Sequence, residues 1–120
     1  MSRAVNGTIS RRRRKKVLSM AKGFRSARSR AFRKAREAVE KSLSYSYRDR
    51  RARKRDFRRL WIARINAAVR NEGMTYSNFM HGLKKANIDI DRKVLSDMAI
   101  HNEASFKVLL DTARSQLGQA

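Results

Sequence analysis

The chain lacks several of the residues that shape or interrupt protein folds. It has 120 residues, with no cysteine, no proline and only 5 glycines. Without cysteine it can form neither a disulfide nor a thiolate zinc site. Proline and glycine are the strongest helix breakers, so their scarcity favours long helices. The composition therefore predicts an all-α fold.

Long apolar stretches are missing as well. No apolar run approaches the roughly 18 residues of a membrane-spanning helix, and the N-terminus lacks the apolar segment of a secretory signal. A basic, acid-poor N-terminus is also typical of organellar transit peptides. Here, however, the basic composition continues through residues 1–60. We therefore interpret this region as part of the mature protein.

Acidic residues are scarce, and unevenly so. The chain carries 31 Lys or Arg against 10 Asp or Glu, a net charge of +21. Residues 1–60 hold 23 of these cations and 4 of the acids (net +19), whereas residues 61–120 hold 8 and 6 (net +2). Such asymmetry indicates a polyanion-binding extension joined to a folded module. We expect a basic extension over residues 1–59 and a compact α-helical domain over residues 60–120.

Three polyanions compete as partners of this extension: nucleic acid, an anionic membrane surface and acidic proteins. Membrane binding requires a broad apolar face, but the apolar residues of the extension are mainly alanine, with scattered residues such as Phe32 and Leu43. Arg outnumbers Lys, which suits bidentate contacts to phosphates and stacking on bases. Nucleic acid is the favoured partner, and no membrane partner is expected.

The densest charge lies in residues 48–59, which read RDRRARKRDFRR and contain eight cations in twelve residues. A helix through this stretch points cations in almost every direction, so it has no face for a protein core. Repulsion between the cations opposes the helix unless a polyanion surrounds it. We predict phosphate contacts for the cations of residues 48–59 and then of residues 11–16. The full set of predicted nucleic-acid-binding residues is Arg11, Arg12, Arg13, Arg14, Lys15, Lys16, Lys22, Arg25, Arg28, Arg30, Tyr47, Arg48, Arg50, Arg51, Arg53, Lys54, Arg55, Arg58 and Arg59.

Two further groups of side chains extend this prediction. A second, smaller basic cluster comprises Lys84, Lys85, Arg92 and Lys93. For this cluster, contact with nucleic acid and ordinary solvation are equally good interpretations. Aromatic residues interleave with the arginines of the extension at Phe24, Phe32, Tyr45 and Tyr47. For the two tyrosines, stacking on a base or sugar is as good an interpretation as packing within the protein.

The pattern of the extension predicts its helices. Residues 1–9 lack periodicity and are expected to form an extended tail. Thr8 or Ser10 then caps a first short helix that Gly23 ends. Nothing breaks a second helix over residues 25–70, although the serines of residues 42–46 mark a place for a bend. It is no coiled coil, because large apolar residues do not occupy the a and d positions.

Beyond residue 60 the pattern becomes that of a small helical bundle. Thr75, Asp91 and Asn102 are the expected N-caps of three short helices. Trp61 is expected to anchor the core at the junction with the extension. The other residues expected to face inward recur at helical spacing and are Phe57, Leu60, Ile62, Ile65, Ala68, Val69, Tyr76, Phe79, Met80, Leu83, Val94, Leu95, Met98, Phe106, Leu109, Leu110, Ala113 and Leu117.

No residue pattern supports catalysis. His81 and His101 lie twenty residues apart, without the spacing of metal ligands. Asp89 and Asp91 are better explained by helix entry and capping than as a catalytic pair. There is no Gly-rich phosphate loop and no nucleophile motif. We expect no enzyme activity, no cofactor, no metal and no small-molecule substrate.

Several strings resemble one family in order along the chain. They are KKVL (residues 15–18), AKGF (21–24), ARSR (27–30), YRDRRARKRDFRRLWIARINAA (47–68), YSNF (76–79), GLKKA (82–86) and IDIDRKVLSDMA (88–99). The chain resembles the bacterial large-subunit ribosomal protein twenty family. Two local departures are Asn6-Gly7, where a basic residue is expected before the glycine, and Arg25-Ser26, which replaces a pattern of small, aromatic or glycine residues.

The resemblance implies a function for the two parts. It implies a basic helical extension that threads large-subunit ribosomal RNA, beside neighbouring ribosomal proteins, and a small helical C-terminal domain. It further implies a structural role in subunit assembly, in a cytoplasmic ribosome or in an organellar one. In some members the C-terminal domain represses translation of the protein's own messenger RNA. The rivals are a DNA-compacting, histone-like protein and a pure messenger-RNA regulator.

Overall fold

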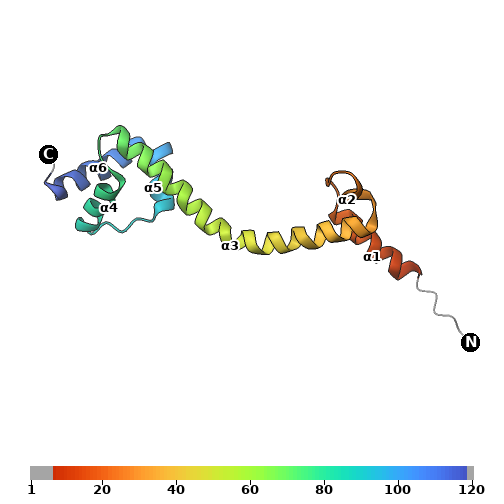
Figure 1. Cartoon of the computed structure of the whole chain (residues 1–120). Coiled ribbons are helices and arrows are strands. Elements are labelled where there is room, and N and C mark those ends of the chain that lie inside the picture. Colours follow the sequence, from red (N-terminus) through yellow and green to blue (C-terminus); the bar gives the residue numbers. More distant parts are fainter. Residues whose placement is uncertain (1–6, 119–120) are drawn as a thin grey trace, which may run out of the picture. The chain divides into compact units, whose positions relative to one another are not determined.

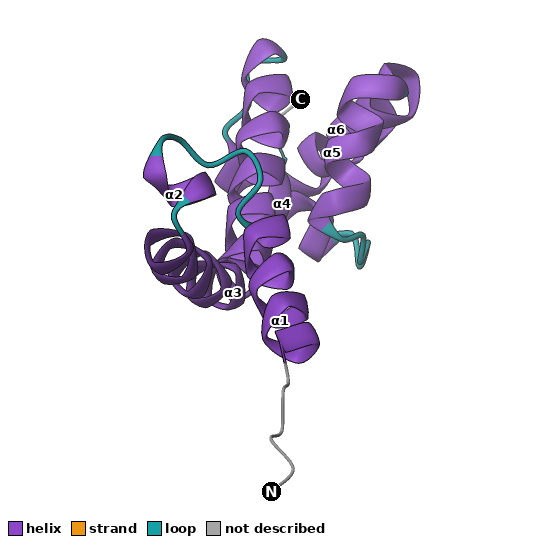
Figure 2. Cartoon of the chain, turned by 90° about the vertical axis from the view of Figure 1, so that its right-hand side faces the viewer, coloured by secondary structure: helices purple, strands orange, loops and turns teal. Residues whose placement is uncertain are grey.

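The chain is all-α in the computed structural model, which describes residues 7–118. In chain order the helices are α1 (Gly7–Met20), α2 (Ala27–Arg30), α3 (Phe32–Asn71), α4 (Tyr76–Lys85), α5 (Arg92–His101) and α6 (Glu103–Leu117) (Figure 1). Within residues 7–118 there is no β-strand (Figure 2). The predicted all-α fold is confirmed. The chain divides into two compact units at Arg51 and Ala52, and α3 contributes to both.

The first unit has a small core between the end of α1 and the start of α3. Ala21 and Ala35 are completely buried and Val39 is nearly so. Partly buried apolar side chains pack around them, Phe24 among them. Because two of the buried side chains are single methyl groups, the helices can approach closely. The chain reverses between them at Gly23, whose φ of 91° is a conformation that glycine adopts readily.

Two expectations about the extension were wrong. The second helix does not begin at residue 25, because the backbone leaves helical geometry at Ser26 (φ 62°, ψ −140°) and again at Ala31 (φ −81°, ψ 119°). Packing of Phe24 and Ala35 accompanies these breaks, so tertiary contacts override the local helix preference. Residues 7–9, expected in an extended tail, are helical, so α1 begins before the predicted caps. Residues 1–6 of that tail lie outside the described residues.

From Phe32 onward α3 runs without interruption to Asn71. It continues through the serines of residues 42–46, where the Ser46 hydroxyl donates a hydrogen bond of 2.9 Å to the carbonyl oxygen of Ser42. This is the usual way in which a helix accommodates an interior serine. At the far end Gly73, with a φ of 77°, ends the helical run.

The second unit encloses the larger core. Helix α6 packs against both α4 and α5, and Phe79 and Phe106 meet with ring centroids 5.4 Å apart. Gly82 of α4 lies directly against Ala113 of α6, since a Cβ atom at Gly82 would stand 2.6 Å from the Ala113 carbonyl oxygen. The buried residues of this core are Ile65, Val69, Met74, Phe79, Leu83, Leu95, Phe106, Leu110 and Ala113.

The three predicted N-caps of this unit are confirmed. The Thr75 hydroxyl accepts from the amide of Asn78 at 3.3 Å, and the Asp91 carboxylate accepts from the amide of Val94 at 2.8 Å. The Asn102 side chain accepts from Ser105. Each cap satisfies one of the amides that the first turn of a helix leaves unpaired. Short polar residues therefore fix where α4, α5 and α6 begin.

Some of the inward-facing residues were predicted wrongly. Phe57, Leu60 and Val94 are exposed, at 48%, 41% and 46% of their surfaces. Trp61 is only partly buried and lies outside the core cluster; its nearest aromatic contact is with Phe57, at 6.2 Å between centroids. Helix α3 enters the core through Ile65 and beyond, so the turns before it keep their apolar side chains at the surface.

Candidate nucleic-acid interface

The middle of α3 is a fully exposed cationic helix. From residue 43 to residue 60 every side chain is exposed except Ala52, which is partly buried. The eight cations of residues 48–59 therefore all reach solvent, as the sequence indicated. An α-helix turns 100° per residue, so these cations surround its axis. This stretch can be contacted from several sides at once.

The few acids of the extension neutralise little of this charge. Residues 7–60 contain four ion pairs, which are Lys34–Glu37 at 3.4 Å, Arg36–Glu40 at 2.9 Å, Arg48–Asp49 at 3.0 Å and Arg59–Asp56 at 3.8 Å. All of these side chains are more than half exposed. Such surface pairs contribute little to stability. The other cations of residues 7–60 have no carboxylate within 4.0 Å among the described residues.

Helix α1 carries a second run of cations. Residues 11–16 are all exposed. The guanidinium of Arg14 lies 5.2 Å from the centroid of the Phe32 ring, a cation–π contact between α1 and the first residue of α3. Lys22, Arg25, Arg28 and Arg30, between these helices, are also exposed. All the cations predicted in the extension are therefore available to a partner.

The tyrosines of α3 hold arginine side chains in place. The Arg51 guanidinium lies 4.9 Å from the centroid of the Tyr47 ring and donates a 2.8 Å hydrogen bond to its hydroxyl. Arg48 lies 4.5 Å from the centroid of the Tyr45 ring. Both tyrosines remain exposed. Stacking reduces the freedom of these guanidinium groups, which favours ordered phosphate contacts.

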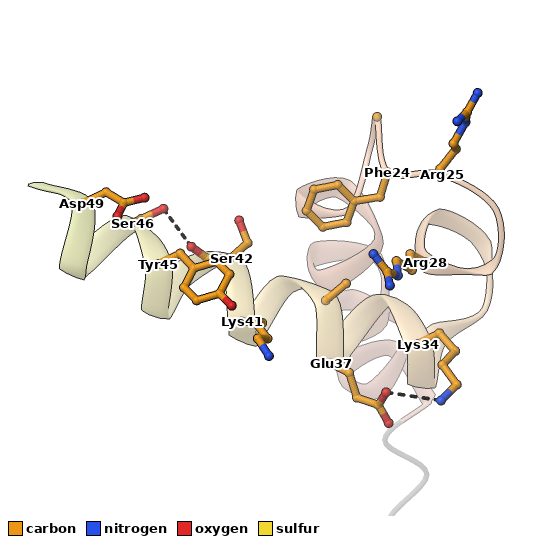
Figure 3. A pocket seen from close by; sticks show the side chains of 12 residues that line it. Phe24, Arg25, Arg28, Lys34, Glu37, Lys41, Ser42, Tyr45, Ser46 and Asp49 are labelled. Carbon is orange, nitrogen blue, oxygen red and sulfur yellow. Dashed lines mark hydrogen bonds and ion pairs between the residues drawn. The ribbon is translucent and has the colours of Figure 1, made fainter.

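A groove opens beside α3 in the first unit. Its volume is about 900 Å³. Figure 3 shows Phe24 projecting from the α1–α2 loop toward α3, on which Ser42 and Tyr45 lie. Lys41 is a further lining residue. The sequence prediction did not include Lys41 as a site residue, although its spacing of four from Tyr45 was a usable signal.

The smaller cluster of the second unit is less uniform. Lys84 and Lys85 at the end of α4 are exposed, as is Lys93 in the first turn of α5. Arg92 is partly buried, and its Nε donates a 2.9 Å hydrogen bond to the Tyr76 hydroxyl. Arg92 thus has a structural partner within the fold, whereas the three lysines extend into solvent.

The histidine side chains and most of the carboxylates beyond residue 60 lie at the surface. Nδ1 of His101 lies 3.0 Å from a carboxylate oxygen of Asp97, and both side chains are exposed. Within residues 7–118 no three His, Asp or Glu side chains gather in a way that could hold a metal ion. In that same part of the chain, none of the helices combines the length and apolar character of a membrane span.

A strongly cationic exposed helix followed by a nearly neutral helical segment, residues 61–120 with a net charge of +2, is typical of basic proteins that bind polyanions. Comparison with known protein families identifies the family to which the chain belongs. The profile of "Ribosomal protein L20" matches residues 3–109. The chain therefore belongs to the ribosomal protein L20 family, as its sequence strings predicted. Because this is a family of structural ribosomal proteins, the prediction that the chain is not an enzyme is confirmed.

Individual relatives match over nearly their whole length. A protein of Leptothrix cholodnii named large ribosomal subunit protein bL20 is 61% identical over 117 residues, covering 98% of this chain and 99% of the relative. Proteins of the same name from Akkermansia muciniphila and Thermomicrobium roseum are 58% and 55% identical. Each covers 98% of this chain, and 92% and 100% of the respective relative.

Proposed function

We propose that this chain is a structural constituent of the large ribosomal subunit that binds large-subunit ribosomal RNA directly and promotes assembly of the subunit. Membership of the L20 family assigns it to the ribosome in the cytoplasm. The proposal gives residues 1–59 the RNA-binding role and residues 60–120 the role of a folded domain. It makes RNA and neighbouring ribosomal proteins the partners.

The observation that carries the proposal is the exposure of residues 43–60. A charged helix without a packing face is unstable by itself, because neighbouring cations repel one another. RNA phosphates on several sides would reverse the sign of that interaction. Arginine contacts would also release counterions condensed on the RNA, which favours binding. We infer that RNA helices approach one another around this part of α3.

The recognition would depend on RNA shape more than on sequence. The major groove of A-form RNA is too deep and narrow for side chains to read base edges. Phosphate contacts position a protein without specifying sequence. A junction of several RNA helices would supply the shape, and exposed aromatic side chains would supply a few stacking contacts. We expect the extension to gain much of its helix on binding.

The test is a salt series with the full chain and a large-subunit rRNA fragment. Replacing Arg50, Arg53, Lys54 and Arg55 by glutamine removes four exposed cations while retaining good helix formers. If each contacts a phosphate, the slope of log K against log salt should fall by about 3 to 4. The matched control, Lys107→Gln, removes a cation that pairs with Glu72 in the second unit and should leave the slope unchanged. An unchanged slope in the fourfold variant contradicts the proposal.

A second role is favoured by the three exposed lysines of the second unit. We propose that Lys84, Lys85 and Lys93 contact RNA, and that through them the domain represses translation of its own messenger RNA. Replacing all three by glutamine should relieve repression of a reporter that carries the protein's own leader, while subunit incorporation persists. Full repression by the variant would refute this role.

A further inference from the structure

The groove beside α3 differs from the rest of the extension because it combines cations with aromatic surface. Its volume of about 900 Å³ lies at the upper end of the range for pockets that hold small organic groups. Phe24 and Arg28 line it from the segment before α3, while Lys41 and Tyr45 line it from α3 itself (Figure 3). Both walls lie within the first unit.

The charge available in the groove is positive. Its two carboxylates already have partners, since Glu37 pairs with Lys34 and Asp49 pairs with Arg48. Arg25, Arg28 and Lys41 have no carboxylate within 4.0 Å among the described residues. An anionic group entering the groove would therefore meet cations whose charge is not already matched.

The aromatic rings of the groove are only partly covered by other side chains of the protein. Tyr45 is 44% exposed and belongs to neither core cluster. Its ring is approached by two cations of its own helix, Arg48 at 4.5 Å and Lys41 at 5.8 Å from the centroid, and both are exposed side chains that a base could displace. Phe24 packs its inner side against the small core of the first unit yet also lines the groove. An acidic peptide would be attracted by the cations, but flat aromatic surface beside unmatched cations is the combination that binds a nucleotide.

We propose that the groove receives one unpaired nucleotide of the bound RNA, with its base stacked on Tyr45 beside Phe24 and its phosphate held by Arg25, Arg28 or Lys41. The inference rests on the proposed function, because it assumes that the extension binds RNA. It adds a site at which the protein contacts a base in addition to the phosphates. Stacking accepts any base, so the site selects an extruded nucleotide and not a sequence.

The first test compares variants of Tyr45 in the full chain, with a large-subunit rRNA fragment as probe. Tyr45→Ala should weaken binding about 5- to 150-fold, the effect of losing one base–aromatic stack. It should not change the salt slope, because no cation is removed. Tyr45→Phe should bind like the unaltered protein. Leu43→Ala is the matched control, since Leu43 is exposed, lies on the same helix and does not line the groove.

The second test identifies the nucleotide. Photocrosslinking of the complex should join Tyr45 or Phe24 to one unpaired residue of the rRNA fragment. Removing only the base of that nucleotide should weaken binding of the unaltered protein as much as Tyr45→Ala does. Combining the abasic RNA with Tyr45→Ala should then cause little further loss, because the same contact is already missing.

The outcomes separate this inference from the proposed function. If the unaltered protein binds rRNA but Tyr45→Ala binds equally well, the nucleotide site is refuted and the charge-based function stands. Additive effects of the abasic RNA and of Tyr45→Ala also refute the site. If the unaltered protein shows no preference for rRNA, the proposed function itself fails. Circular dichroism of Tyr45→Ala bound to rRNA checks that α3 remains helical.

Discussion

Gly82 is the position where the structure predicts the sharpest response to a small change. The substitution Gly82→Ala adds one methyl group to α4. In a helix with free space on that side it would stabilise the protein by up to about 1 kcal/mol, because alanine is the better helix former. At Gly82 the new Cβ atom would stand 2.6 Å from the Ala113 carbonyl oxygen and 2.7 Å from the Ala113 Cβ atom.

The expected loss of stability follows from how far α6 would have to move. Carbon atoms in contact prefer separations of about 3.5–4.0 Å, so α6 must move by roughly 1 Å. No side-chain rotation can relieve the contact, because the obstructing atoms belong to the backbone and Cβ of Ala113. Moving α6 disturbs Phe106 and Leu110, which are buried in the same core. Overpacking of this kind typically costs about 1–3 kcal/mol, and we expect a loss near 2 kcal/mol.

Thermal unfolding of the full chain, followed by circular dichroism, measures this effect. For a unit of this size a loss of about 2 kcal/mol lowers Tm by roughly 8–16 °C. Gly7→Ala is the matched control, since a Cβ atom there has nothing within 4 Å, and it should not lower Tm. A Gly82→Ala protein with an unchanged or raised Tm would show that α4 and α6 do not meet at this glycine.

Two further predictions concern local backbone geometry. Asp91→Ala removes the cap of α5 and should lower the free energy of unfolding, measured by urea denaturation, by about 1 kcal/mol. Asp89→Ala, at an exposed position without a capping bond, should change the free energy of unfolding by less than about half of that. Equal effects of the two substitutions would argue against capping. Ser26→Gly should relieve a φ of 62° that is unfavourable for a side-chain-bearing residue by roughly 1–3 kcal/mol. In the rRNA-bound chain it should therefore slow amide hydrogen exchange around Ala35 at least about fivefold; unchanged exchange would show that Ser26 is unstrained.

The sequence predicted those features of the fold that depend on short-range chemistry. Thr75, Asp91 and Asn102 cap helices because their side chains reach amides three residues ahead. The core residues of α6 recur at helical spacing for the same local reason. The cationic middle of α3 was predictable as exposed, because no packing partner can accept so many charges.

The errors arose where distant contacts decide the conformation. Ser26 and Ala31 interrupt the helix although neither is glycine or proline, and nothing local distinguishes them from neighbouring helical residues. Trp61 has the size and apolar character of a core residue, yet the core begins one turn later at Ile65. The groove was visible only as separate aromatic residues, because it forms when the chain folds back after Gly23.

The central claim is that the extension recognises the shape of folded ribosomal RNA and does not bind every polyanion equally. The most direct measurement is the affinity of the full chain for a folded large-subunit rRNA fragment and for duplex DNA of the same length, over one salt series. Both affinities should fall with salt, since both involve phosphates. We expect a preference for the rRNA fragment that persists at moderate salt. Equal affinity for the two nucleic acids at moderate salt would contradict the account and favour a DNA-compacting protein.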